Sequence, residues 1–272
     1  MKIFAYVSSY RQKDSECLLL TKKIIDNINE EIDEKNEIVI KTASSFTISE
    51  CIGCLHCFHT GYCGIKDDME CLKKELESSD LIIIASPVFA HNVTGNLKNI
   101  IDRLTYWVHL MHLKGKLGIN IVVSSSNGNS FVSNYLSKIM EYLGISVLAK
   151  ISITYDIMSK EAINSVIDVE SKNLISKIRK KTYEITQQQE EYFSTQKWVI
   201  QNHPKNSFER KYWEEKGYLN KKNYREVFDQ YFVLKNKGIY AINHKIPVRE
   251  ERLKPMPVIL FIPIFIVLLK CN

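Results

Sequence analysis

Short apolar runs alternate with longer amphipathic segments along the first 190 residues of the chain. Five of these runs are mostly continuous rather than alternating with polar residues, which is typical of parallel strands buried on both faces. They cover residues 2–7, 37–43, 81–87, 118–126 and 146–154. The hydrophobic pattern therefore predicts five strands of a buried parallel sheet.

The segments between these strands have the three- and four-residue apolar spacing of helices. They cover residues 18–32, 67–77, 97–110, 131–143 and 160–189. We expect Leu19 on the buried side of the first helix, Asp67 or Asp68 as the N-cap of the second, and Asp102 and Arg103 as surface charges of the third. Strict alternation of strand and helix predicts an α/β fold, a doubly wound five-stranded parallel sheet of the flavodoxin-like type.

Ligands of doubly wound sheets bind beyond the carboxyl ends of the strands, so the residues that follow each strand are candidates for a site. The first strand is followed by hydroxyl side chains, Arg11 and a predicted helix N-terminus, a combination that suits a phosphate group. An ordinary N-cap loop is the alternative. Because this loop contains no glycine, it matches neither a dinucleotide-binding loop nor a P-loop.

Two further loops have side chains suited to a flat ring system. The third strand is followed by Phe89 and His91 among small polar residues, which could line such a ring. The fourth strand runs into the sequence SSSNGN, residues 124–129, whose small side chains permit close approach and whose backbone amides can bond a polar ring edge. A plain turn is the alternative for the second of these loops.

Four of the seven cysteines lie within thirteen residues, at Cys51, Cys54, Cys57 and Cys63. Two-residue gaps let a loop wrap one iron–sulfur cluster, and a longer gap brings in the fourth thiolate. Gly53 and Gly61 supply the backbone freedom that such wrapping needs. The spacing predicts a [4Fe–4S] site, with zinc or metal-free thiols as alternatives. His56 and His59 are expected to tune the site rather than to ligate.

Four stretches together resemble the NADPH-dependent FMN reductase group of flavodoxin-like proteins, and in particular its iron–sulfur flavoprotein branch. They are SSYRQKDSEC, CIGCLHCFHTGYCGIKDDM, SPVFAHNVTGNLKNIIDRL and SSSNGN, and the similarity covers roughly residues 1–185. Two departures stand out. The glycine and proline of the family's usual G-S-P-R phosphate loop are absent, and Phe89 stands where the family usually has tyrosine.

The resemblance implies FMN as cofactor, a [4Fe–4S] cluster, and NAD(P)H or another low-potential electron donor. It places the FMN phosphate near Ser9, Arg11 and Ser15. It places the isoalloxazine near Pro87, Val88, Phe89 and Asn92. It places the pyrimidine side of the flavin, or a neighbouring subunit, near Ser125, Asn127 and Gly128. It assigns the cluster to Cys51, Cys54, Cys57 and Cys63, and it implies a homo-oligomer, a dimer or a tetramer.

The expected function is that of a flavin-dependent oxidoreductase in which FMN converts two-electron into one-electron chemistry and the cluster relays single electrons to a redox partner or small-molecule acceptor. Two alternatives remain open. One is a metal-free NAD(P)H-dependent FMN or quinone reductase. The other is a non-catalytic flavin-binding sensor or carrier subunit. The chain start shows no secretory leader pattern, so a cytoplasmic location is expected.

Residues 190–272 form a predicted helical, basic extension after a flavodoxin-like domain at 1–189. Residues 196–272 carry 15 Lys and Arg against 7 Asp and Glu, whereas residues 1–195 carry 22 against 24. This excess suggests either an anionic partner or a solvated extension. Helices are expected to stop at Gly217 and Gly238. No nucleic-acid-binding module is recognisable, so we expect no nucleic-acid partner.

The chain closes with an apolar run at residues 256–269 that contains two prolines. A membrane-spanning helix needs about 20 residues, so this run is too short to span a bilayer. It could lie in the membrane interface, giving the protein a membrane-surface contact, or it could be an arm buried against another protomer. Both interpretations remain open.

Overall fold

Five parallel strands form one sheet in the computed structural model of the chain, which describes residues 1–32, 35–181 and 183–236. The strands are β1 (Lys2–Val7), β2 (Glu37–Thr42), β3 (Leu81–Pro87), β4 (Leu117–Ser124) and β5 (Ser146–Thr154). Their order is β2-β1-β3-β4-β5, which is the flavodoxin-like doubly wound order. The predicted fold class is confirmed, and this order puts the carboxyl ends of β1, β3 and β4 side by side.

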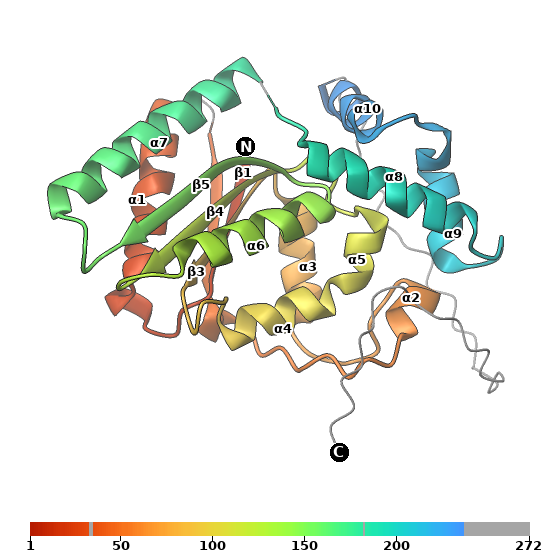
Figure 1. Cartoon of the computed structure of the whole chain (residues 1–272), viewed down its shortest axis with the longest axis horizontal. Helices are drawn as coiled ribbons and strands as arrows, with labels where there is room; N and C mark the ends of the chain where they lie inside the picture. Colours follow the sequence, from red (N-terminus) through yellow and green to blue (C-terminus); the bar gives the residue numbers. More distant parts are fainter. Residues whose placement is uncertain (33–34, 182, 237–272) are drawn as a thin grey trace. The chain divides into compact units, whose positions relative to one another are not determined.

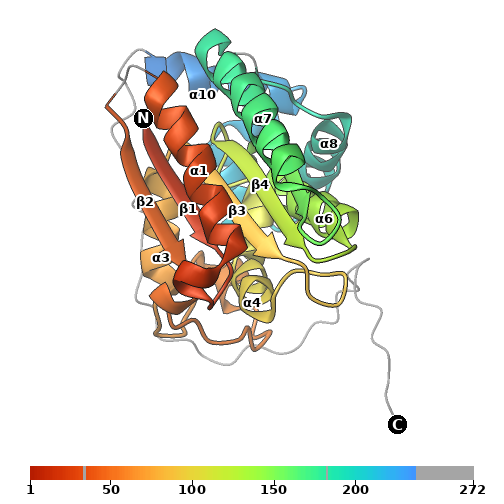
Figure 2. The same cartoon turned by 90° about the vertical axis from the view of Figure 1, so that its left-hand side faces the viewer.

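Helices cover both faces of the sheet (Figures 1 and 2). One face is covered by α1 (Glu16–Glu31) and α7 (Lys160–Lys180), whose apolar side chains share one buried cluster with the strands. The other face is covered by α3 (Met69–Ser78), α4 (Gly95–Arg103), α5 (Thr105–Leu110) and α6 (Asn129–Tyr142). The two apolar clusters bury both faces of the strands, which explains their continuous apolar sequences.

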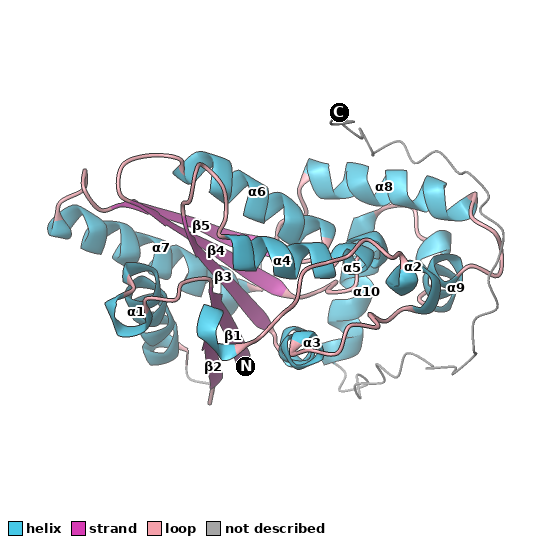
Figure 3. Ribbon diagram, turned by 90° about the horizontal axis from the view of Figure 1, so that it is seen from below, coloured by secondary structure: helices cyan, strands magenta, loops and turns pink. Residues whose placement is uncertain are grey.

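Three helices of the basic extension enlarge the second cluster. They are α8 (Gln187–Gln201), α9 (Phe208–Glu215) and α10 (Tyr224–Asn236), and Figure 3 shows them beyond α5, with α9 next to the short α2 (His56–Thr60). Aromatic rings join them, since Phe193 lies 5.4 Å from Trp213 and 5.9 Å from Tyr224 between ring centroids. The helix expected to stop at Gly217 is confirmed, whereas Gly238 and the apolar run 256–269 lie outside the described residues.

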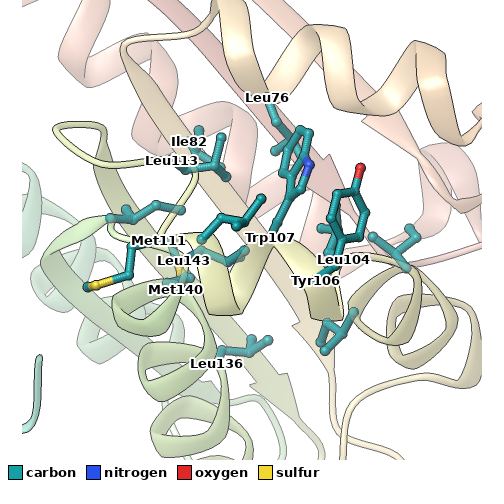
Figure 4. Close-up of a cluster of buried hydrophobic side chains, with 14 of the residues drawn as sticks. Leu76, Ile82, Leu104, Tyr106, Trp107, Met111, Leu113, Leu136, Met140 and Leu143 are labelled. Carbon is teal, nitrogen blue, oxygen red and sulfur yellow. The ribbon is translucent and has the colours of Figure 1, made fainter. Parts of the chain in front are cut away.

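The third predicted helix is two helices rather than one. The chain bends at Leu104, with φ −94° and ψ 1°, between α4 and α5. The bend lets Tyr106 and Trp107 enter the apolar core, where Figure 4 shows them with Leu104 and Leu143. Arg103 is only 2% exposed, so its assignment to the surface was wrong. Apolar spacing alone does not reveal such a bend because both helices contribute to the same buried cluster.

Two other helix predictions need correction. The segment 160–189, predicted as one helix, contains the end of one helix and the start of another. α7 ends before Lys181, which adopts a left-handed conformation with φ 52°, and α8 begins after the N-cap Thr186. Leu19 is 49% exposed because the buried face of α1 is centred on residues such as Leu18, Leu20 and Ile24. Among the helices that the structure describes, none is long and apolar enough to cross a bilayer.

Candidate functional site

Backbone hydrogen bonds hold the loops after β1, β3 and β4 together at the carboxyl edge of the sheet. The N–H of Ser8 donates to the carbonyl of Ala85 at 2.8 Å, and the N–H of Val88 donates to the carbonyl of Val123 at 2.9 Å. These bonds continue the pairing of the strands into the loops. The three loops therefore begin next to one another, as a ligand site in a doubly wound sheet requires.

The first loop offers hydroxyl groups from its buried side and a cation from its exposed side. Ser8, Ser9 and Ser15 are buried, and Arg11 is exposed. Ser15 is the N-cap of α1, since its Oγ accepts from the N–H of Leu18 at 3.2 Å. The Oγ of Ser8 is buried without a hydrogen-bond partner among the described residues. A buried hydroxyl without a partner costs free energy, so this atom is available to a ligand.

The second loop, residues 87–92, is closed by a tight turn. Phe89 and Asn92 exchange two backbone hydrogen bonds of 2.9 Å, and the two residues between them, Ala90 and His91, have φ of 49° and 58°. This is the geometry of a two-residue hairpin turn. It leaves the Phe89 ring 61% exposed at the rim of the sheet, while the Oδ1 of Asn92 accepts from the N–H of Val93 at 2.8 Å.

The third loop contacts the second directly. Nε2 of His91 lies 3.0 Å from Oδ1 of Asn127, and the His91 ring stacks on Phe131 at 5.3 Å between centroids. Gly128 has φ 87°, and a Cβ there would lie 2.7 Å from Cγ1 of Val88. The glycine thus permits a close approach that any other residue would prevent.

Every residue expected to contact FMN lies in one of these three adjacent loops. Their residues are Ser9, Arg11 and Ser15 in the first loop, Pro87, Val88, Phe89 and Asn92 in the second, and Ser125, Asn127 and Gly128 in the third. The sequence did not indicate the contact of His91 with Asn127. Nor did it indicate the hydrogen bond from Asn96 of α4 to the hydroxyl of Tyr6, 3.0 Å long, because its partners lie 90 positions apart.

The cysteine segment forms a separate loop around α2. Gly53, Leu55 and Gly61 all have positive φ, so the chain turns sharply on both sides of the helix. Cys51 and Cys54 are exposed, whereas the other two cysteines of this segment are half-buried, and all four are free thiols.

The four thiols lie close enough to influence one another electrostatically. Burial, followed by the negative charges of the Cys63, Cys51 and Cys54 thiolates, raises the pKa of Cys57 to about 11. Within the described residues, however, no group of three or more Cys, His, Asp or Glu side chains converges as it would around a metal ion. The donor set has the chemistry of an iron–sulfur site, while its thiols are not gathered into a coordination shell.

A buried ion pair lies under the cysteine loop. The guanidinium of Arg103 contacts both carboxylate oxygens of Asp67, at 2.7 and 3.2 Å. Burial alone would lower the pKa of Arg103, but the hydrogen bond to Asp67 and the charge of a Cys63 thiolate outweigh it and raise the pKa. The Cys63 side chain is therefore a close neighbour of this guanidinium.

The helix α4 connects the two candidate sites. Its N-cap Thr94 follows the loop that carries Phe89, and its last residue, Arg103, contacts the cysteine segment. Asn99 of the same helix donates to the carbonyl of Ile48 at 3.5 Å. With a rise of about 1.5 Å per residue, the helix is about 13 Å long. The flavin loops and the cysteine loop thus meet opposite ends of one short helix.

The extension covers the outer side of the cysteine loop. Phe58 of α2 meets His109 of α5 edge to face, at 4.9 Å between ring centroids. Glu209 of α9 lies between two histidines, with Oε1 2.9 Å from Nδ1 of His109 and Oε2 3.2 Å from Nδ1 of His203. Phe58 thus packs α2 against α5, and Glu209 joins α9 to the same helix.

The sequence model of the NADPH-dependent FMN reductase family matches residues 1–156 of the chain, which is more than half of its length. The chain belongs to this family. The match includes β1 to β5 and all three loops at the carboxyl edge of the sheet, and it includes the cysteine segment. The resemblance inferred from the sequence motifs is thereby confirmed.

Curated relatives match the same part of the chain. An iron–sulfur flavoprotein of Archaeoglobus fulgidus is 38% identical over 125 residues, which cover 45% of this chain and 57% of the relative. An FMN-dependent NADH:quinone oxidoreductase of Metamycoplasma arthritidis is 30% identical over 141 residues, which cover 46% of this chain and 71% of that protein. The chain thus spans little more than half the length of the first of these relatives.

One solved structure has a similar fold. It is the crystal structure of RosB with a bound intermediate, 8-demethyl-8-formylriboflavin-5'-phosphate, and it covers 97% of this chain and 100% of its own length. The TM-score is 0.50 at 14% sequence identity, so the similarity concerns the fold alone.

Proposed function

We propose that the chain is a flavin-dependent oxidoreductase that binds FMN at the loops after β1, β3 and β4 and reduces it with NAD(P)H or another low-potential donor. The observation that carries the proposal is the convergence of these loops at one sheet edge. Two buried hydroxyl oxygens without partners among the described residues, Ser8 Oγ and Ser124 Oγ, lie at this edge. They fit a ligand with polar groups, and membership of the FMN reductase family supports FMN as that ligand.

Each loop has a distinct role in this proposal. Ser9, Arg11 and Ser15 hold the phosphate, Arg11 by its charge and Ser15 through the hydroxyl hydrogen that N-capping leaves free. Pro87, Val88, Phe89 and Asn92 line the isoalloxazine, and Ser125, Asn127 and Gly128 bond its pyrimidine edge. FMN, when bound, supplies the conversion between two-electron and one-electron chemistry. The side chains orient the ring and keep water from it.

Titration of flavin-free protein with FMN tests the site, and NADPH or NADH oxidation under anaerobic conditions tests the activity. Tight, stoichiometric binding of FMN and its bleaching by a nicotinamide donor would support the proposal. Binding of FMN without turnover by any donor would favour the flavin-binding sensor or carrier instead. Failure to bind FMN would contradict the proposal as a whole.

We also propose that Cys51, Cys54, Cys57 and Cys63 hold a [4Fe–4S] cluster that relays single electrons to a redox partner or small-molecule acceptor. The thiol spacing and the iron–sulfur flavoproteins among the relatives support this. Iron, acid-labile sulfide and FMN are measured in protein purified without exposure to air. About four irons and four sulfides per chain support the cluster. Flavin without iron favours the metal-free FMN or quinone reductase, and zinc is the remaining outcome.

The proposed assembly is a homo-oligomer whose neighbouring protomer covers the flavin edge, in a cytoplasmic protein. Large side chains at this edge are exposed in the single chain, namely Tyr10 at 67% and Phe131 at 62%. In the proposed domain arrangement, residues 1–189 bind FMN and the extension 190–272 clasps this domain or meets an anionic partner. Light scattering of the FMN-loaded protein tests the oligomeric state, and sedimentation with anionic lipid vesicles tests a membrane-surface contact.

A further inference from the structure

The ion pair between Arg103 and Asp67 is almost fully withdrawn from water. The Arg103 side chain is 1% exposed and the Asp67 side chain 5%. Burial of two charges costs several kcal/mol per ion, and apolar residues of similar volume often stabilise a protein as well or better. Stability alone therefore does not explain why this part of the structure contains a charged pair, and its other contacts indicate a different role.

The pair joins the two ends of the cysteine segment. Oδ2 of Asp67 accepts from the N–H of Ser49 at 2.8 Å, and Oδ1 accepts from the N–H of Met69 at 3.0 Å. Arg103 Nη1 also donates to the carbonyl of Ser49 at 2.8 Å. Ser49 precedes the first clustered cysteine by two residues, and Asp67 follows the last by four. Asp67 and Arg103 thus close the segment into a loop at its base.

One nitrogen of the same guanidinium has no oxygen partner. Nε of Arg103 is buried and donates to no oxygen of the residues that the structure describes. The Cys63 side chain lies within hydrogen-bonding reach of this guanidinium, since a side-chain hydrogen bond and the charge of Cys63 both contribute to the raised pKa of Arg103. A thiolate bound to iron is a strong acceptor that needs donors around it, and such partners commonly tune the site as well as position its ligands.

We propose that Arg103 is a positioning residue for the cysteine site. Its terminal nitrogens close the loop through Asp67 and Ser49, and its Nε donates a hydrogen bond to the sulfur of Cys63 when that thiolate ligates iron. This inference rests on the proposed function of the four cysteines. It assigns a role to a residue of α4, and α4 also begins at the flavin loops, so the same helix would connect the positions of the two cofactors.

The experiment compares wild type with Arg103→Lys and Asp67→Asn, each purified anaerobically with FMN. Asp102→Asn is the matched control, because Asp102 is the neighbour of Arg103 on the same helix but pairs with Lys98 at the surface. Hydrogen exchange of peptides covering residues 47–69 reports loop closure without any need for a cluster. Iron release to a chelator and the midpoint potential of the cluster report the effect on the loaded site.

We expect exchange in residues 47–69 to quicken in both variants and to stay unchanged in Asp102→Asn. Iron release should quicken about tenfold in Arg103→Lys, which keeps the charge but loses the planar fork. The midpoint potential of the cluster in Arg103→Lys should fall. The reduced cluster has one more negative charge than the oxidised cluster and therefore suffers more from the loss of a hydrogen-bond donor. A loss of thermal stability or FMN content in one variant would mark misfolding, in which case exchange and iron release in the other variant provide the comparison.

The outcomes separate this inference from the proposed function. Wild-type protein that holds iron, with variants unchanged in exchange, iron release and potential, would overturn the role of Arg103 and leave the cluster intact. Faster exchange without a change in potential would reduce Arg103 to loop closure and overturn the bond to Cys63. Wild-type protein with flavin but no iron would contradict the cluster and the bond to a ligating Cys63, and the exchange data would still decide whether the ion pair closes the loop.

Discussion

The ring of Phe208 in α9 occupies the space that a side chain on Gly61 would need. A Cβ on Gly61 would lie 2.4 Å from this ring, well inside van der Waals contact. Gly61 ends α2 in a left-handed conformation, with φ 82°, and its N–H donates to the carbonyl of Cys57 at 2.9 Å. The cysteine loop and the basic extension therefore fit together at a position that tolerates only glycine.

Gly61→Ala should destabilise the protein by about 2–4 kcal/mol, because it combines a left-handed backbone with overpacking against Phe208. Thermal unfolding and urea titration measure the loss. Gly53→Ala is the matched control. It also has positive φ, 65°, but no atom lies within 4 Å of its added Cβ, so it should cost only about 1–2 kcal/mol. Equal losses in the two variants would mean that the contact with Phe208 contributes nothing.

The strands could be predicted almost residue by residue from the sequence. β1, β3 and β5 begin and end where the apolar runs do, because a strand buried on both faces shows its limits in its own composition. The helix boundaries were less accurate, since apolar spacing does not reveal the bend at Leu104 or the left-handed residue Lys181 at the end of α7.

Only part of the site was accessible to the same reasoning. Each loop lies directly after its strand, so its position followed from the predicted topology. Contacts across the site did not follow, because the ion pair of Arg103 with Asp67 and the contact of His91 with Asn127 each join residues 36 positions apart. A charge inside an amphipathic helix has the same sequence pattern whether it faces solvent or a buried carboxylate.

Arg11→Ala should weaken FMN binding about ten- to a hundredfold, since Arg11 is the exposed cation of the first loop and a charge-assisted hydrogen bond contributes about 1.5–3 kcal/mol. Quenching of flavin fluorescence on titration of flavin-free protein measures the affinity. Lys13→Ala, in the short helical turn Gln12–Asp14 of the same loop, provides the control for a general loss of positive charge. A similar loss in both variants would point to long-range attraction rather than to a phosphate contact at Arg11.

Gly128→Ala should separate the second and third loops. The added Cβ would lie 2.7 Å from Val88 and 3.1 Å from His91, and the left-handed backbone adds about 1–2 kcal/mol of strain. We expect lower thermal stability and FMN binding weakened by about tenfold or more, because ring contacts depend on both loops. Gly95→Ala, at the first residue of α4, adds a Cβ with no atom within 4 Å and should change neither quantity. Unchanged FMN affinity in Gly128→Ala would place the ring elsewhere.

The buried Lys114 should make the stability of the protein depend on pH between about 7 and 10.5. The Lys114 side chain is buried, and its Nζ lies 4.9 Å from the centroid of the Tyr218 ring. Its charged neighbours are Lys216 and Lys116. Burial, followed by the charges of these two lysines, lowers the pKa of Lys114 from 10.5 to about 7. Between these two values the unfolded chain binds the proton and the folded chain does not. Stability due to this residue therefore rises with pH in that window.

Lys114→Met should consequently be more stable than wild type at pH 6.5, and the difference should shrink by about 1.4 kcal/mol per pH unit between pH 7 and 10. Urea unfolding of both proteins at pH 6.5, 8 and 9.5 measures this difference. Subtracting the two stabilities removes the contribution of the titrating groups that the two proteins share. Lys98→Met, which removes an exposed ammonium paired with Asp102, provides the control and should show no such slope. A difference that stays constant with pH would mean that Lys114 remains protonated in the folded protein, with an acceptor that compensates its burial.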